Sequence, residues 1–443
     1  MLLGSGAMIV SNFVNTVFRL GMIALLARVY AREEFGVWVA ITSMTAVLVT
    51  SDFGIGNALR NKLAWLAAKG EKGNDDAREY FLSVLYCFLL AAIVLSIGVV
   101  IGGRFVPLQM LFRTSNVVLR LAGAEILTVA QVIFLLGIPL GLGPVMFFAY
   151  QETNWSAAFG VAYGLSGAVV VFGLALIGQS IVSTAIGYFL AGLVVTTIGT
   201  VVFLIRRRWN PLRVTPRLIL PRVWGLLSLG LRFAAIQVSG AFIYNAATLV
   251  TSATIGVGDA AEYNLVQKLY TFAIGLYLGL YNPLWSAYAD AAHRDDWNWC
   301  ERTLKRTLVL TAVIFGGFAV FVTMFGNSLL KVMAGGQYIS QRLLFALLGL
   351  WALCHILWSC VMAFLTAVER INMMAILTVI CAGLFVPIGG ILGKRLGIVG
   401  IAVASVVVLA PLAILGHITA FRVVRRARLR PRIRETMEGC GKA

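Results

Sequence analysis

The feature that most constrains this chain is a series of long apolar runs, each about as long as a helix that crosses a bilayer. Such a helix needs about 20 predominantly apolar residues. Twelve runs of this kind, bounded by charged or turn residues, follow one another along the 443 residues. The predicted spans are 5–28, 35–57, 80–101, 124–149, 155–177, 181–205, 226–255, 262–288, 307–330, 343–367, 373–392 and 398–421.

The composition agrees with an all-α polytopic membrane protein. Apolar residues make up 60% of the chain and charged residues 12%, whereas soluble domains have about 45–50% and about 25%. The apolar runs are continuous and do not alternate, which argues against a β-barrel. The formal charge of +18 would suggest a nucleic-acid partner in a soluble chain. In a membrane protein it marks cytoplasmic loops instead, so we expect no nucleic acid.

The basic residues predict the orientation. With the N-terminus in the cytoplasm, the cytoplasmic segments hold 24 Lys and Arg residues, against nine on the other side. Positive loops stay inside, so we expect both termini in the cytoplasm. The predicted domains are a six-helix bundle at 1–205, a basic cytoplasmic linker at 206–225, a second six-helix bundle at 226–421 and a basic tail at 422–443. The linker and tail act either as topology signals or as contacts to anionic lipid headgroups.

Polar residues recur on one face of two predicted spans. Asn12, Asn15 and Arg19 fall within an arc of about 100° on the first span. The span 262–288 carries a longer stripe: Asn264, Gln267, Lys268, Thr271, Gly275, Asn282 and Ser286. Polar residues also join helices to one another in membranes. A full charge inside a span is costly, however, so Arg19 and Lys268 favour a wet, positive cavity that suits a phosphate-bearing substrate.

Three further charged residues lie within or beside spans. Arg232 lies nearer the cytoplasm on the span 226–255, where it either lines the cavity or extends its charge to the membrane surface. Asp52 lies several residues inside its span, and Glu125 lies at the mouth of another. These two carboxylates are the candidates for ion coupling, although Asp52 also suits a cap on a bent helix end.

The sequence lacks the groupings that covalent chemistry requires. Six Cys and three His residues are scattered without the spacing of a metal site. We find no nucleophile–base pair and no nucleotide-binding loop. We therefore expect neither an enzyme nor a bound cofactor.

Two segments resemble Wzx-like polysaccharide flippases. Residues 27–38 (ARVYAREEFGVW) resemble the turn after the first helix of these proteins, and residues 51–64 (SDFGIGNALRNKLA) resemble the end of their second helix. Residues 262–290 match more loosely. The family is similar in fold to the wider multidrug/oligosaccharidyl-lipid/polysaccharide exporters. The resemblance implies two six-helix bundles around a central cavity, which is lined by the first, second, seventh and eighth spans.

The resemblance also implies a function. It predicts that an undecaprenyl-diphosphate-linked oligosaccharide is moved from the cytoplasmic to the periplasmic leaflet of the bacterial inner membrane, coupled to an ion gradient. Arg19 and Lys268 would hold the diphosphate, while Asn12, Asn15, Asn264 and Asn282 would bind diphosphate or sugar. Membrane lipid, a polysaccharide polymerase and chain-length proteins are the implied partners. The alternatives are a multidrug exporter of the same fold and a membrane-embedded glycan polymerase or transferase.

Overall fold

The computed structural model describes the backbone of residues 2–48, 55–67, 69–105, 108–212, 214–368, 370 and 372–440. Within these ranges it leaves undescribed the side chains of residues 2–12, 47–48, 57, 71–72, 216, 218, 228–244, 276, 278–283, 285–286, 372–373, 375 and 429–440.

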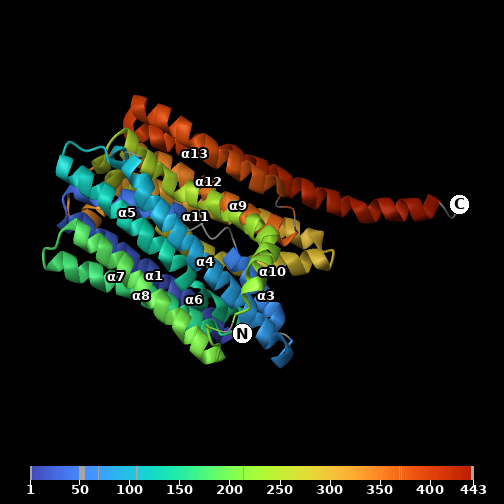
Figure 1. Ribbon diagram of the computed structural model, residues 1–443. Coiled ribbons are helices and arrows are strands. Elements are labelled where there is room, and N and C mark those ends of the chain that lie inside the picture. The colour runs from blue at the N-terminus through green and yellow to red at the C-terminus, as the bar shows by residue number, and fades with distance from the viewer. Residues whose placement is uncertain are drawn as a thin grey trace. The chain divides into compact units, whose positions relative to one another are not determined.

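The described residues form helices joined by short turns, without a strand (Figure 1). The first half contains α1 (Leu2–Val29), α2 (Arg32–Leu48), α3 (Ile55–Ala67), α4 (Glu71–Phe105), η2 (Leu108–Leu111), α5 (Val117–Leu140), α6 (Leu142–Met146), η3 (Phe147–Tyr150), α7 (Thr153–Leu176) and α8 (Ile181–Arg207). The second half contains α9 (Pro216–Thr254), α10 (Val257–His293), α11 (Trp297–Ala334), α12 (Arg342–Ala367) and α13 (Asn372–Cys440).

The twelve predicted spans fall on helical residues, apart from the undescribed stretch 49–54, the break at Gly141 and the end residues Ile177 and Ile255. The last two spans both lie in α13, where Gly397 has non-helical angles (φ 63°, ψ −148°). A left-handed residue of this kind interrupts a helix, and glycine adopts it without steric cost. By length and composition, seven helical segments of the described chain are able to cross a membrane. The last of these, Ile376–Arg428, contains both spans of α13.

The chain divides into two compact units. The first contains residues 1–264 with 331–338, and the second contains residues 265–330 with 339–443. This division differs from the predicted domains because α9 packs against α2, α3 and α4. Arg222 on α9 donates to Glu79 on α4 at 2.5 Å, and Ser252 near the end of α9 donates to the Leu111 carbonyl at 2.6 Å. The linker at 206–225 between two six-helix bundles therefore remains a prediction.

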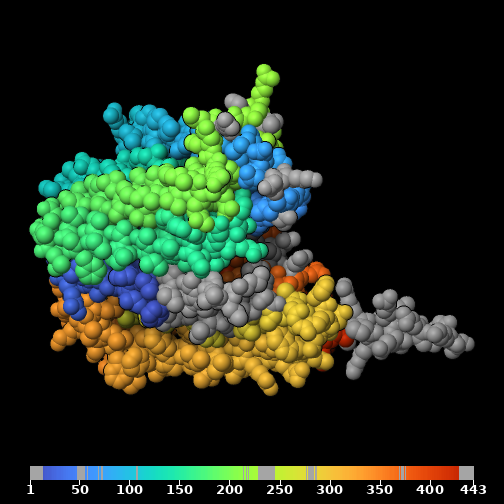
Figure 2. Space-filling view, turned by 90° about the horizontal axis from the view of Figure 1, so that it is seen from below, coloured from blue at the N-terminus to red at the C-terminus, as the bar shows by residue number. Residues whose placement is uncertain are grey.

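The helices of the first unit pack in the order α1, α7, α8, α5 and α4. In Figure 2 the green residues of α7 and α8 cover one face of this unit. The outer side of α8 is apolar and exposed at positions three or four apart: Leu190, Val194, Ile198, Val201 and Ile205. A continuous exposed apolar stripe on a helix of this length is typical of contact with lipid.

The second unit has its own polar ties. Asn327 on α11 bonds the backbone of Ser340 twice, donating to its carbonyl at 3.0 Å and accepting from its N–H at 2.9 Å. The Tyr270 hydroxyl of α10 donates to the Phe345 carbonyl of α12 at 2.7 Å. Glu301 near the start of α11 accepts from Lys305 at 2.6 Å and also bonds Arg428 of α13. These contacts join the part of α10 after Asn264 to α11, α12 and α13 within the second unit.

Candidate functional site

The turn between α1 and α2 is held by side chains from the first flippase-like segment. Glu34 accepts a hydrogen bond at 3.1 Å from the N–H of Ala31, just before α2. A carboxylate in the first turn satisfies a backbone donor that the helix leaves free. Glu33 accepts from the Thr114 hydroxyl at 2.5 Å. The Tyr30 hydroxyl donates to the Gln179 carbonyl at 2.8 Å. Residues 30–34 therefore contact two other parts of the first unit, at Thr114 and at Gln179.

Arg32 lies at the centre of a charged group that we call the Arg32 cluster: Arg32, Asp259, Glu262 and Tyr338. Its Nη2 atom is 2.6 Å from Glu262 Oε2 and 3.5 Å from Asp259 Oδ1. The guanidinium carbon lies 5.7 Å from the centre of the Tyr338 ring, which is within cation–π range. The Glu262 side chain is only 7% exposed. The cluster thus joins α2, α10 and the segment after α11 through one partly shielded cation.

Arg28 makes a second connection at the same turn. Its Nε donates to the Met333 carbonyl at 3.0 Å, and its Nη2 donates to the Val332 carbonyl. In return, Gln337 donates to the Arg28 carbonyl at 3.1 Å. The last carbonyls of a helix lack intrahelical partners, and a cation is favourable there. Arg28 therefore closes the C-terminal end of α11.

Gly36 shows how closely α2 approaches the start of α10. A Cβ atom built on Gly36 would overlap the Val257 carbonyl oxygen. The neighbouring backbone is also paired, since the Val257 N–H donates to the Arg113 carbonyl at 3.1 Å. A polar cleft of about 610 Å³ lies beside this contact, with Arg32, Glu33, Arg113 and Asp259 in its wall. The flippase-like segment thus builds a tightly packed, charged end of the first unit.

Arg19 is exposed on α1. No carboxylate of the described residues forms an ion pair with Arg19, whereas Arg32 and Arg222 of the same unit each pair with a carboxylate. Its environment therefore fits a cation that is accessible to a ligand.

Asn15 and Asn264, two predicted ligands of the substrate, make contacts between helices. The Asn15 amide oxygen is buried against Gly164 of α7, where a Cβ atom would overlap it. Asn264 is 4% exposed, and its amide donates to the Thr248 hydroxyl of α9 at 3.2 Å. The Asn264 bond matches the alternative that polar residues join membrane helices, whereas the Asn15 oxygen has no hydrogen-bond partner among the described residues. Their binding of substrate stays a prediction.

The other predicted residues are distributed as follows. Lys268 is half-buried on α10 and belongs to the second unit, whereas Arg19 belongs to the first. Glu125 is exposed on α5. The side chains of Asn12, Arg232 and Asn282, and all of Asp52, lie outside the described residues.

Comparisons with known proteins support the fold. No protein-family model matches the chain, and no curated protein matches it. The inward-facing conformation of a multidrug resistance MATE family transporter of the MOP superfamily is similar over 94% of this chain and 95% of that chain, with a TM-score of 0.78 and 15% identity. The outward-facing conformation of a MATE family transporter matches 96% of this chain and 95% of that chain, at a TM-score of 0.62 and 16% identity.

The lipid II flippase MurJ, in an inward closed conformation, is also similar. It matches 96% of this chain and 88% of its own, with a TM-score of 0.70 and 16% identity. Likeness at such low identity establishes a shared fold and no more. The predicted all-α, multi-pass membrane fold is therefore confirmed, and so is the expected likeness to the fold of the wider exporter group.

Proposed function

We propose that this protein is a flippase that moves an undecaprenyl-diphosphate-linked oligosaccharide from the cytoplasmic to the periplasmic leaflet by alternating access. The observation that carries the proposal is Arg19, an exposed guanidinium on a membrane helix, without an ion-pair partner among the described residues. A charge in that position is costly unless water or an anion meets it. A guanidinium offers a planar pair of donors that matches two phosphate oxygens.

The proposed substrate assigns different roles to the polar residues. Arg19 and Lys268 bind the diphosphate, and Asn12, Asn282 and Arg232 contribute to the same wet surface. Asn15 and Asn264 bind the diphosphate or the sugar, and each has a buried amide oxygen without a hydrogen-bond partner among the described residues. Transport breaks no covalent bond, so the function needs no nucleophile. The similarity of the fold to MurJ adds support, because that protein is a flippase of lipid II.

A multidrug exporter is the second candidate, and the MATE likeness favours it. An exporter of cationic drugs would be expected to present a carboxylate to its substrate. The accessible charge of α1 is instead positive. The flippase proposal therefore explains Arg19, whereas cation export does not.

The two candidates are separated by one reconstitution experiment. The purified protein is placed in liposomes with a fluorescent prenyl-diphosphate oligosaccharide, and an impermeant quencher measures how much of it reaches the outer leaflet. We expect transfer between leaflets to exceed that of protein-free liposomes, to rise with an imposed ion gradient and to leave the mass of the lipid unchanged. An altered mass would indicate a polymerase or transferase. Transport of cationic dyes without lipid transfer would support the multidrug exporter.

The cellular setting follows from the same proposal. We place the protein in the bacterial inner membrane with both termini in the cytoplasm. A polysaccharide polymerase and chain-length proteins are the proposed partners, because a flipped oligosaccharide must then be polymerised on the periplasmic side.

A further inference from the structure

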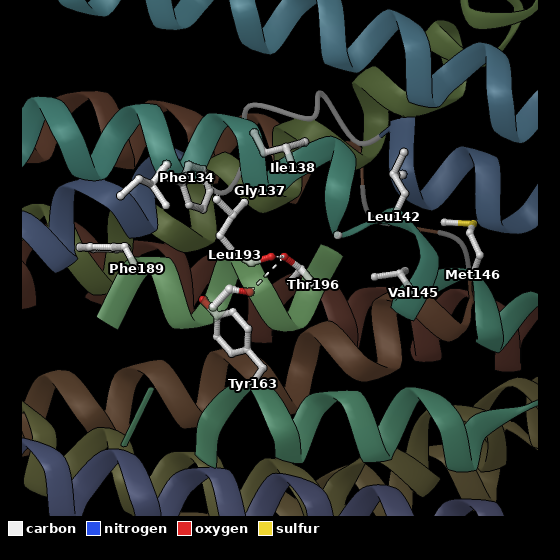
Figure 3. Close-up of a pocket in the computed structure, with 14 residues that line it drawn as sticks. Phe134, Gly137, Ile138, Leu142, Val145, Met146, Tyr163, Phe189, Leu193 and Thr196 are labelled. Atoms are coloured by element: carbon white, nitrogen blue, oxygen red, sulfur yellow. Dashed lines mark hydrogen bonds between the residues drawn. The ribbon is translucent and has the colours of Figure 1, made fainter. Parts of the chain in front are cut away.

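An apolar cavity of about 330 Å³ lies inside the first unit, among α5, α6, α7 and α8 (Figure 3). Side chains such as Phe134, Ile138, Leu142 and Leu193 face it, and Gly137 forms part of its wall. A Cβ atom on Gly137 would find its nearest neighbour, Leu193 Cδ1, 3.9 Å away. Glycine at this position thus leaves room that a larger side chain would fill.

The cavity lies at a break between two helices. Pro139 stands near the end of α5, and Gly141 separates α5 from α6. Thr200 of α8 fixes this break, since its hydroxyl donates to the Leu140 carbonyl at 2.6 Å and accepts from the Gly143 N–H at 2.9 Å. These two backbone groups at the break are therefore paired within the protein. A cavity with such walls favours an apolar ligand over water.

The hydroxyls in the wall add little polarity. The Thr196 hydroxyl donates to the carbonyls of Gly192 and Leu193 in its own helix, each at 3.0 Å. The Tyr163 ring packs over Gly192, where a Cβ atom would lie 2.7 Å from Tyr163 Cε2. The main body of the cavity is thus suited to a hydrocarbon chain.

Tyr163 links the cavity to the cation of α1. It lines the cavity, and the adjacent Gly164 lies against the Asn15 side chain, one turn before Arg19 on α1. α1 and α7 therefore meet at the level of the cavity. Side chains on a helix lean toward its N-terminus, which directs Arg19 back toward Asn15 and Tyr163. An apolar slot and an accessible cation therefore lie next to each other.

We propose that this cavity binds the isoprenoid segment next to the diphosphate of a prenyl-diphosphate lipid, while Arg19 binds the diphosphate. The inference rests on the proposed function and extends it, because it assigns a site to the lipid part of the substrate. The occupant must be both apolar and anionic, as the cavity and Arg19 together require. At 330 Å³ the cavity is at the small end of ligand pockets. It holds a short segment of the chain, and the remainder stays in the bilayer.

The first test measures binding of three probes to the full chain in lipid nanodiscs: farnesyl diphosphate, farnesol and inorganic diphosphate. Gly137→Leu fills the cavity, and the matched control Gly173→Leu adds the same side chain where no atom lies within 4 Å. Each methylene group of the ligand that is excluded from an apolar site lowers the affinity about fourfold. We expect Gly137→Leu to weaken farnesyl diphosphate binding by about tenfold or more and to leave inorganic diphosphate unchanged. Arg19→Gln should weaken both diphosphates.

Three results would overturn the cavity assignment. They are an unchanged farnesyl diphosphate affinity in Gly137→Leu, an equal loss in Gly173→Leu, and wild-type binding of inorganic diphosphate as tight as that of farnesyl diphosphate. A photoreactive farnesyl diphosphate gives a second measurement that needs no variant. Labelled peptides from α5, α6 or α8 within residues 133–146 or 189–196 support the assignment. Labels confined to the exposed apolar face of α4 contradict it.

The outcomes also separate this inference from the function on which it rests. If the wild-type protein flips the lipid-linked oligosaccharide but the cavity variants behave as wild type, the cavity assignment alone fails. If farnesyl diphosphate binds in the cavity but the lipid-linked oligosaccharide is not moved, the proposed function fails. The cavity is then a site for another anionic prenyl lipid.

Discussion

Arg32 and Glu262, which are 230 residues apart in the sequence, form a hydrogen-bonded ion pair of 2.6 Å between α2 and α10. The Arg32 side chain is 42% exposed, and that of Glu262 is 7% exposed. A fully exposed pair contributes little to stability because water screens it. Here one partner is largely shielded, so the pair is stronger than a surface ion pair. It joins the first half of the sequence to the second at the end where α2 begins.

We expect Arg32→Ala to destabilise the protein by about 1.5–3 kcal/mol, the value of a hydrogen bond to a charged group. The melting temperature of the purified protein measures this loss. Arg306→Ala, at an exposed arginine of α11, is the control and should change little. Charge exchange, Arg32→Glu with Glu262→Arg, should recover part of the stability. Equal melting temperatures for Arg32→Ala and Arg306→Ala would show that the pair contributes nothing.

Gly36→Ala should also destabilise the first unit. The added methyl group would overlap the Val257 carbonyl oxygen, and overpacking against backbone costs about 1–3 kcal/mol. Gly98→Ala on α4 is the matched control, since a Cβ atom there has no neighbour within 4 Å. Replacing an open helical glycine should stabilise by about 0.5–1 kcal/mol. The two variants should therefore shift the melting temperature in opposite directions, and a shared upward shift would contradict the packing.

The helices were predictable because long apolar runs have one stable form in a membrane. In a membrane each backbone polar group must be hydrogen-bonded within the protein, which favours a helix. The twelve spans could therefore be predicted without tertiary information. The predicted spans 155–177 and 181–205 also separate α7 from α8 at Gly178, which adopts a φ of 73° in the turn. The break between α5 and α6 at Gly141 was not predicted, because the apolar pattern continues across it.

The tertiary roles were less predictable. The partners of Arg28 and Arg32 could not be predicted. They lie some 230 to 300 residues away, and nothing in the local sequence indicates them. Glu262 was placed at the start of a span, a position compatible with exposure or with burial. The position of Tyr163 in the cavity wall was not predicted, because a single aromatic residue in an apolar helix forms no recognisable sequence pattern.

Reporter fusions test the predicted topology. Fusions after Lys72, Arg213, Arg302 and Arg434 should report the cytoplasm, because basic loops are retained there. Fusions near Arg113, Gly258 and Gly336 should report the periplasm. Wrong-side signals at two or more of these sites would exclude the twelve-span, N-in arrangement.

Ion coupling is tested at the two candidate carboxylates. If Asp52 carries a proton, Asp52→Asn should remove the dependence of transport on a pH gradient and leave the protein in the membrane. Glu125→Gln, at an exposed position of α5, tests the second candidate in the same assay. A gradient dependence equal to wild type in both variants would remove both residues from the coupling mechanism.

Arg19→Ala should abolish surface polysaccharide in a flippase-deficient strain without loss of folded protein. Arg19 is exposed, so its removal takes away a costly charge and leaves no described carboxylate unpaired. A charge-assisted bond of about 1.5–3 kcal/mol corresponds to about a 10- to 100-fold loss of affinity for the diphosphate. Blots for polysaccharide and for protein, taken from the same cells, measure both effects.

Conservative replacements show whether Arg19 acts as a ligand or as a packing group. Arg19→Lys keeps the charge but loses the paired donors, so partial activity is expected. Lys268→Arg should be tolerated better than Lys268→Gln, because the proposed diphosphate site needs the charge at both positions. Wild-type polysaccharide in Arg19→Ala would exclude Arg19 as the diphosphate anchor. Disappearance of the Arg19→Ala protein from the membrane would instead mean that Arg19 has a structural role in α1.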